Sequence, residues 1–412
     1  MRLMFAQELI VIKLAITMTF IRKYRFVLLF ILIQFFISQS LAEECTTGLA
    51  SGRVTVDGRP LLWKNRDSSF KDNELAYFDW GKIRFIGIIN ADDTTQVWAG
   101  VNNHGFAIMN AESRDMAVPG EDTQYDDEGY LMKEALIRCK TVSDFEVMLE
   151  ETNVGGRNVT SHFGVIDAKG GASFFETGNH EYFRFDATDK EMCQEGFLIR
   201  ANFACKGYGE KGYGKKRYQR AFDLFKKGNE VSRLNYSYVI SNVTRDIYLP
   251  SLRKSSNFTK TNDTVNRHRT VSCAVFQGVK SYEDPRLTTF WCTLGEPAVS
   301  VSIPLWTYSG GVPTILDSIS YSPLNKVFQE LKAYAYSDSS DSKMINTDRL
   351  IIIQKELDKT QRIIFRRTER KLRKWRKNLP SQEEVINFQE KMVQKAFKAS
   401  VKVRSKIVSG LR

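Results

Sequence analysis

Alternating apolar and polar residues recur through most of the chain before residue 310, and this pattern predicts β-strands. Two strands within 52–63 are expected to form a tight hairpin at Asp57-Gly58, because this dipeptide favours the backbone of a two-residue turn. A second turn is expected at Asn103-His104-Gly105. The remaining strands are expected within 83–90, 95–102, 105–113, 162–177, 266–279 and 288–306.

Helical patterns occupy two separate parts of the chain. Residues 129–139 and 142–152 read as two short helices. After about Ser340 apolar residues recur at roughly helical spacing on both sides of Pro380. They are Ile353, Leu357, Ile364 and Leu372, then Val385, Phe388, Met392 and Ala396. Because strands and helices fall in separate runs, we expect an α+β layered domain over 45–340, with a basic helical hairpin over 341–412 packed on it.

The N-terminal segment has the features of a secretory leader. Residues 26–37 are almost entirely apolar, basic residues precede them, and small residues stand at the cleavage positions before Glu43. We expect 1–42 to be a signal peptide, with Met18 a cleaner start than Met1, and the mature protein to be secreted or periplasmic. The apolar run is short for a membrane span; a retained anchor and a buried hydrophobic helix are the alternatives.

Cys45 lies three residues beyond this leader, and three roles are open to it. A lipid-attachment cysteine follows the cleavage site directly, whereas Glu43 and Glu44 intervene here, so lipidation is not favoured. The cysteine is then either half of a disulfide or a nucleophile. The six cysteines do not settle this choice, although Cys193 and Cys205 could pair with each other in an oxidising compartment.

The net charge and the histidine content of the chain indicate which binding partners are not expected. The net charge is +12, and much of the excess lies between Lys355 and Lys377. Such a run is most often a solvated helix face, so nucleic acid is not expected as a partner, and membrane contact only through the signal peptide. The chain has four histidines, none in a cluster with ligand spacing, and no CxxC motif, so we expect neither metal nor other cofactor.

A cysteine next to a removable segment has its own means of activation. A thiol is a strong nucleophile only as the thiolate, and it therefore needs a base or a cation nearby. If one further cut between Glu44 and Cys45 made the cysteine N-terminal, its α-amine, with a pKa near about 8, would provide that base. Residues 43–44 would then be a short propeptide.

Five short motifs occur in an order that resembles a known family. They are CTT at 45–47, KNRD at 64–67, WAGVNNHGFAIMN at 98–110, RANF at 200–203 and GYGKKRYQRA at 212–221. Together they resemble the choloylglycine hydrolase and isopenicillin-N acyltransferase group of N-terminal nucleophile (Ntn) hydrolases, in particular its acyltransferase-like (C45 peptidase) branch. The resemblance covers roughly 45–304. It implies the four-layer αββα sandwich of these hydrolases.

The resemblance also implies roles for individual residues. Cys45 matches the nucleophile, and Asp67 matches the aspartate that orients its α-amine. Asn102 and Asn202 match two asparagines near the oxyanion hole, where donors face charge that appears only in the tetrahedral intermediate. Arg217 matches an arginine that supports the electrostatics of the nucleophile.

The segment before Asp67 departs from the family pattern. Many relatives have arginine three residues before the aspartate, where this chain has Lys64, whereas Arg66 directly precedes it. Lys64, Asn65 and Arg66 are therefore candidate supporting residues, and which cation lies near the thiol stays open. Ordinary roles are also open: Asn65 to Asp67 would suit a surface turn, and Asn102 lies in a turn-forming sequence.

The function that these residues predict is a secreted amidase or acyltransferase acting on a linear non-peptide amide. Cys45 would form a thioester with the acyl group of a small-molecule substrate, and hydrolysis is favoured over transfer because transfer needs an acceptor site. One alternative is a catalytically inactive secreted binding or scaffold protein of the same fold. Another is a disulfide-stabilised extracellular domain with Cys45 paired to a distant cysteine.

Overall fold

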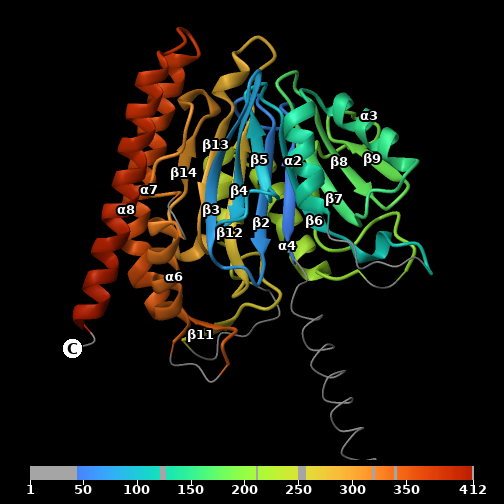
Figure 1. Cartoon of the computed structure of the whole chain (residues 1–412). Coiled ribbons are helices and arrows are strands. Elements are labelled where there is room, and N and C mark those ends of the chain that lie inside the picture. The colour runs from blue at the N-terminus through green and yellow to red at the C-terminus, as the bar shows by residue number, and fades with distance from the viewer. Residues whose placement is uncertain are drawn as a thin grey trace, which may run out of the picture. The chain divides into compact units, whose positions relative to one another are not determined.

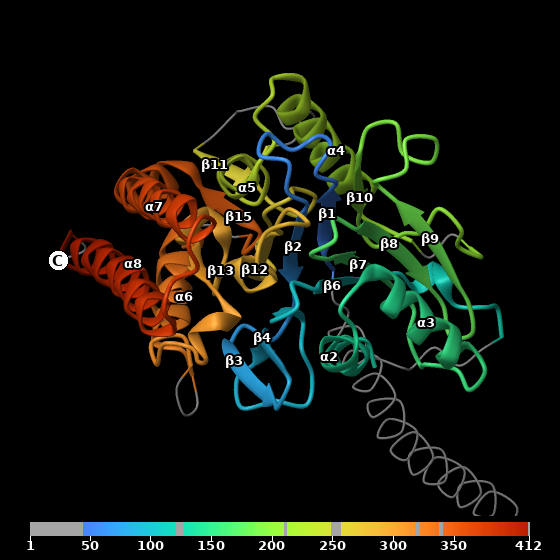
Figure 2. The same cartoon turned by 90° about the horizontal axis from the view of Figure 1, so that it is seen from above.

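The computed structural model describes residues 44–120, 127–209, 212–248, 257–317, 321–337 and 341–410. The predicted signal peptide and Glu43 lie outside the described residues. Two antiparallel sheets form the centre of the described part (Figures 1 and 2). One sheet has the strand order β10-β1-β2-β12-β13-β14, and the other has the order β3-β4-β5-β6-β7-β8-β9.

The first sheet comprises β1 (Thr46–Ala50), β2 (Leu61–Asp67), β10 (Phe197–Arg200), β12 (Thr270–Gln277), β13 (Thr289–Thr293) and β14 (Ile303–Leu305). The second comprises β3 (Asn73–Trp80), β4 (Ile83–Asn90), β5 (Ala99–Asn102), β6 (Ala107–Glu112), β7 (Ser161–Ile166), β8 (Ala172–Thr177) and β9 (Tyr182–Asp186). A separate small pair joins β11 (Phe258–Lys260) to β15 (Met344–Asn346).

The two sheets pack face to face, with β1 and β2 of the first sheet against β6, β7 and β8 of the second. Gly164 on β7 shows how close this packing is. A Cβ atom there would lie 2.3 Å from the Met109 side chain and 2.9 Å from that of Leu62, so only glycine fits without a shift. Every residue of β2 is buried, which places its polar end, Lys64 to Asp67, inside the protein.

Helices cover the outer faces of both sheets. α2 (Glu128–Arg138) and α3 (Val142–Asn153) pack on the seven-stranded sheet through a core that includes Phe145 and Phe175. On the six-stranded sheet, α4 (Lys215–Glu230) packs on β1 and β10, and α5 (Tyr236–Tyr238) packs on β12. The π-helical turn η2 (Val239–Val243) follows α5 and packs on α4. Among the described helices, none is both long and apolar enough to cross a membrane.

Three further helices complete the layer on the six-stranded sheet (Figure 2). They are α6 (Pro323–Tyr336), α7 (Thr347–Trp375) and α8 (Gln382–Gly410). The Phe365 ring on α7 meets Trp291 of β13 edge-on, and Trp375 meets Trp306 in the same way. The predicted α+β fold, its αββα layering and its C-terminal helical hairpin are thus confirmed.

Most predicted elements are present, but two differences matter. The expected hairpin within 52–63 is wrong: β1 ends at Ala50 and β2 begins at Leu61, and residues 51–60 form a turn-rich connection. Hydrogen bonds explain the long loop, since Ser51 donates to Gly196 and Val56 to Leu234. The pattern also missed β1, β3, β9, β10, α4 and α6, whereas the turn at Asn103-His104-Gly105 is confirmed.

Candidate active site

Cys45 directly precedes β1, between the neighbouring strands β10 and β2 of the six-stranded sheet. Its side chain is completely buried. The preceding residue, Glu44, extends the pairing with β2, because its backbone N–H donates to the carbonyl of Asp67 at 3.0 Å. The pairing with β2 therefore extends to the Glu44–Cys45 peptide, the bond whose cleavage would free the cysteine amine.

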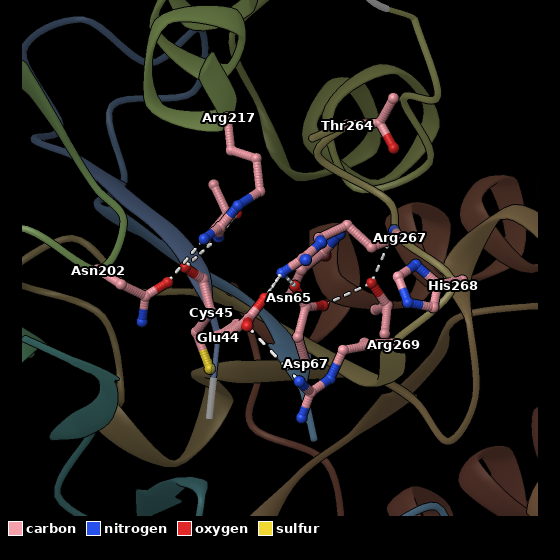
Figure 3. Close-up of polar contacts among 12 residues, drawn as sticks. Glu44, Cys45, Asn65, Asp67, Asn202, Arg217, Thr264, Arg267, His268 and Arg269 are labelled. Carbon is pink, nitrogen blue, oxygen red and sulfur yellow. Dashed lines mark hydrogen bonds and ion pairs between the residues drawn. The ribbon is translucent and has the colours of Figure 1, made fainter. Parts of the chain in front are cut away.

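Arg217 is brought to Cys45 from the first turn of α4 (Figure 3). Its Nη1 donates to the Cys45 carbonyl oxygen at 2.7 Å and to the Thr46 hydroxyl at 2.8 Å, and its Nη2 donates to the Asn202 Oδ1 at 2.8 Å. Burial lowers the pKa of Arg217, and the charge of Arg267 adds to this effect. In Figure 3 the Cys45 sulfur lies on the opposite side from Arg217, so the guanidinium fixes the backbone rather than the thiol.

Local backbone geometry allows this approach. Gly214, the N-cap of α4, has a φ of 90°, a conformation that side chains other than glycine rarely adopt. A Cβ atom at this position would lie 2.5 Å from Arg217 Nη2. Asn202 is held just beyond β10 by a bridge to Tyr213, and its Nδ2 donates to the Glu112 carbonyl at 2.8 Å. Asn202 therefore connects Arg217 to the second sheet.

Asp67 lies at the end of β2 and is completely buried. The Thr270 hydroxyl donates to its Oδ1 at 2.6 Å, and Arg267 Nη1 donates to its Oδ2 at 3.2 Å. Burial raises the pKa of Asp67 above its ordinary value, and the charges of Arg267 and Arg217 offset this effect only in part. The structure thus places an acidic group, fixed by two donors, beside the Glu44–Cys45 peptide (Figure 3).

The three candidate supporting residues point in different directions. Lys64 Nζ donates to the Trp98 carbonyl at 3.0 Å and to the side chain of Asn110, in the space between the sheets. Arg66 donates to Asn73 and Asn90 at 2.8 and 2.9 Å and lies over the Trp98 ring, 4.4 Å from its centroid. The cations at these positions are therefore both tied to the seven-stranded sheet.

Asn65 belongs to the opposite face of β2. Its Nδ2 donates to the carbonyls of Thr244 and Val265 at 2.8 and 3.1 Å, and its Oδ1 accepts from the Trp63 indole at 3.0 Å. These contacts join β2 to the loops before and after 249–256. The buried environment of Asn65 and Asp67 excludes the alternative of a surface turn.

Asn102 requires a correction. Its Nδ2 donates to the carbonyls of Leu136 and Cys139, at the end of α2, at 3.0 and 2.8 Å. Its Oδ1 accepts from the backbone N–H groups of His104 and Phe106 in the following turn. Since α2 covers the outer face of the seven-stranded sheet, the Asn102 side chain points away from the six-stranded sheet and from Cys45. The expected position near an oxyanion hole is not observed.

Two arginines near Cys45 were missed by the sequence analysis. Arg267 donates to the Glu44 carboxylate and to Asp67, and Arg269 Nη1 lies 3.5 Å from Glu44 Oε1 (Figure 3). A signal was available in the segment Arg267-His268-Arg269, because charged residues directly before the buried strand β12 need partners inside the protein. The sequence pattern of this segment predicts only the beginning of a strand.

The cysteine, histidine and acidic side chains show whether the described residues form disulfides or a metal site. All six cysteines carry thiols in the structure, and the possible Cys193–Cys205 disulfide is not formed. Burial raises the pKa of Cys273 and Cys292, both on adjoining strands of the six-stranded sheet. Within the described ranges, no group of three or more His, Cys, Asp or Glu residues could hold a metal ion.

Comparison with known proteins gives similarity to solved structures alone. No protein-family model matches the chain, and no curated protein matches its sequence. A mutant of the conjugated bile acid hydrolase from Clostridium perfringens is 13% identical, with a TM-score of 0.38, over 60% of this chain and 88% of that one. Penicillin V acylase from Agrobacterium tumefaciens is 13% identical, with a TM-score of 0.37, over 64% of this chain and 85% of that one.

Proposed function

We propose that the protein is an amidase whose nucleophile is Cys45, freed as an N-terminal residue by cleavage after Glu44. The observation that carries this proposal is the position of Cys45 directly before β1, an inner strand of the six-stranded sheet. There Arg217 holds its carbonyl at 2.7 Å, and Asp67 lies at the end of the paired strand. Buried charges are costly, and a thiol that served only to fill the core would need neither of them.

The proposed reaction has two steps. The α-amine of Cys45 takes the thiol proton, and the sulfur attacks the carbonyl carbon of a linear, non-peptide amide. The carbon–nitrogen bond breaks, the amine leaves with a proton, and the acyl group stays on Cys45 as a thioester. Water then hydrolyses the thioester, or an acceptor amine takes the acyl group in a transferase. Hydrolysis is favoured, since water requires no additional binding site.

The neighbouring residues have distinct parts in this proposal. Asp67 accepts from the α-ammonium group and orients it. Arg217 fixes the Cys45 backbone, and Asn202 positions Arg217 through the hydrogen bond from Nη2 at 2.8 Å. The Asn202 Nδ2 carries two N–H donors and gives one of them to the Glu112 carbonyl, so its proposed action on the oxyanion would use the other. We also propose that 1–42 is a signal peptide and that the mature enzyme is secreted or periplasmic.

Mass spectrometry of the mature protein with simple acyl amides tests the proposal. An increase in mass equal to the acyl group, located on the Cys45 peptide and removed by hydroxylamine, is the expected result for a thioester. The Cys45→Ala variant should keep the fold and form no adduct. Turnover of an amide by Cys45→Ala at the wild-type rate would contradict the assignment, and an inert, unlabelled Cys45 in the native mature chain would favour the scaffold alternative.

A further inference from the structure

The Glu44 carboxylate forms ion pairs with two arginines. Arg267 Nη1 donates to Oε2, and Arg269 Nη1 lies 3.5 Å from Oε1, so each carboxylate oxygen faces a different guanidinium (Figure 3). Burial alone would raise the pKa of Glu44, but the charge and hydrogen bond of Arg267, with the charge of Arg269, lower it. Glu44 is thus held as a carboxylate, beside the peptide bond that maturation would cut.

The arginines are fixed independently of Glu44. The Arg267 N–H donates to the Thr270 hydroxyl at 2.9 Å, and the Thr270 N–H donates to the Arg267 carbonyl at 2.9 Å. The Arg269 carbonyl accepts from the N–H of Ser68 at 3.1 Å, which ties this turn to the end of β2. The guanidinium of Arg267 is also paired with Asp67 at 3.2 Å. Removal of Glu44 would therefore leave the backbone of this segment and the Arg267 guanidinium in place to receive an anion.

This site is open enough to receive a ligand group once Glu44 is gone. The side chains of Glu44 and Arg269 are 21% and 24% exposed, whereas that of Arg267 is 9% exposed. One arginine is thus desolvated and the other reaches solvent. Hydrogen bonds between a carboxylate and guanidinium groups are among the stronger interactions of proteins, and the planar fork of arginine suits carboxylate geometry.

We propose that Arg267 and Arg269 form a subsite for a carboxylate at the end of the substrate acyl chain, a site that Glu44 fills before maturation. The inference rests on the proposed function of Cys45. Glu44 is the acyl part of the Glu44–Cys45 peptide, and three carbon atoms separate its carbonyl from its carboxyl carbon. The matching substrate is an amide whose acyl chain has the same length and charge, as in an N-glutaryl amide.

The reaction of such a substrate balances without a further reagent. The Cys45 thiol adds to the amide carbonyl, the carbon–nitrogen bond breaks, and the amine leaves with the thiol proton carried by the α-amine. The glutaryl thioester then reacts with water, which returns the thiol and releases glutarate. Through both steps the distal carboxylate stays on the two arginines and fixes the position of the reacting carbonyl.

The test compares two probes on the mature chain that begins at Cys45. The probes are N-glutaryl-p-nitroanilide and N-pentanoyl-p-nitroanilide, which share acyl length and leaving group and differ in the distal carboxylate. The expected kcat/KM is higher for the glutaryl probe by roughly tenfold to a hundredfold, the effect of one or two charged hydrogen bonds. In Arg269→Gln this ratio should fall toward unity, and in Arg269→Lys most of it should remain.

Arg286→Gln is the matched control, because Arg286 is a half-buried arginine paired with Asp284. The probe ratio of this variant should equal that of the wild type. Equal turnover of the two probes by the wild type would overturn the carboxylate subsite and leave the amidase proposal standing. A glutaryl preference as large in Arg269→Gln as in the wild type would also overturn it. If neither probe were turned over nor formed a thioester, the amidase proposal would fail and the subsite with it.

Discussion

Arg217 donates a hydrogen bond from Nη1 to the carbonyl oxygen of Cys45 at 2.7 Å, across 172 residues of sequence. The same nitrogen also donates to Thr46, and Nη2 donates to Asn202. A buried guanidinium on a helix therefore fixes the backbone of the proposed nucleophile from the outer layer of the sandwich. The position of Cys45 depends on the packing of α4 as well as on its own strand.

Replacement of Arg217 by Met tests this dependence. The change removes the Arg217 donors from three buried acceptor atoms, so we expect the free energy of unfolding to fall by about 2–4 kcal/mol and kcat/KM to fall with it. Urea unfolding and turnover measure the two effects. Lys216→Met, at an exposed neighbour on the same helix, should change stability by less than about 0.5 kcal/mol. Wild-type stability and turnover in Arg217→Met would refute the structural role.

Asn102 is expected to matter for stability rather than for chemistry. Asn102→Ala removes two donors to the end of α2 and an acceptor for two backbone N–H groups, so the free energy of unfolding should fall by about 2–4 kcal/mol. Well below the melting temperature, kcat should be close to the wild-type value. A loss of kcat by a hundredfold or more in a folded Asn102→Ala variant would restore this residue to the active site.

The completely buried His162 makes stability depend on pH. Burial lowers its pKa to about 4, while in the unfolded chain it titrates near its ordinary value. Between these two pKa values the unfolded chain binds a proton that the native protein does not, so stability is lost as the pH falls from about 6.5 to about 4. The slope from this one group is about 1.4 kcal/mol per pH unit.

Thermal unfolding at a series of pH values measures this loss. His162→Gln should flatten the dependence between about pH 6.5 and 4. A His162→Gln variant with the same slope as the wild type would show that His162 is not held neutral in the native protein.

The C-terminal hairpin is expected to unfold together with the sandwich. The Trp375 ring packs edge-on against Trp306 beyond β14 and against Phe388 on α8, with ring centroids 5.2 and 5.5 Å away. Trp375→Ala should therefore cost about 3–5 kcal/mol and keep a single unfolding transition. Leu379→Ala, at an exposed position near the hairpin turn, is the control. Two separate transitions, with only one affected by Trp375→Ala, would identify 341–412 as an independent unit.

The sequence predicted those parts of the structure that depend on local pattern. Alternation located β4 and β6 to β8, and apolar spacing located α7 and α8, because these elements bury one face or both faces along their whole length. The prediction of a tight hairpin at Asp57-Gly58 was wrong. The turn preference of these two residues was outweighed by hydrogen bonds from the loop to residues distant in the sequence, among them Gly196. Local propensity does not report such contacts.

Only the part of the candidate site that lies in short sequence motifs could be predicted. Cys45, Asp67, Asn202 and Arg217 lie in recognisable short motifs, and the structure brings them into one cluster (Figure 3). Asn102 lies in an equally suggestive motif, but which face of its strand carries the side chain depends on the register of the sheet. Arg267 and Arg269 had no motif, and only the contact with Glu44 shows their connection to the site.

The most direct test of the central claim is the intact mass and N-terminal sequence of the mature protein from cells that secrete it. We expect a chain that begins at Cys45, with a free α-amine on the nucleophile and the Glu44 carboxylate gone from Arg267 and Arg269. A fully active mature chain that begins at Glu43 would contradict this claim, because Cys45 would then have no amine to act as its base.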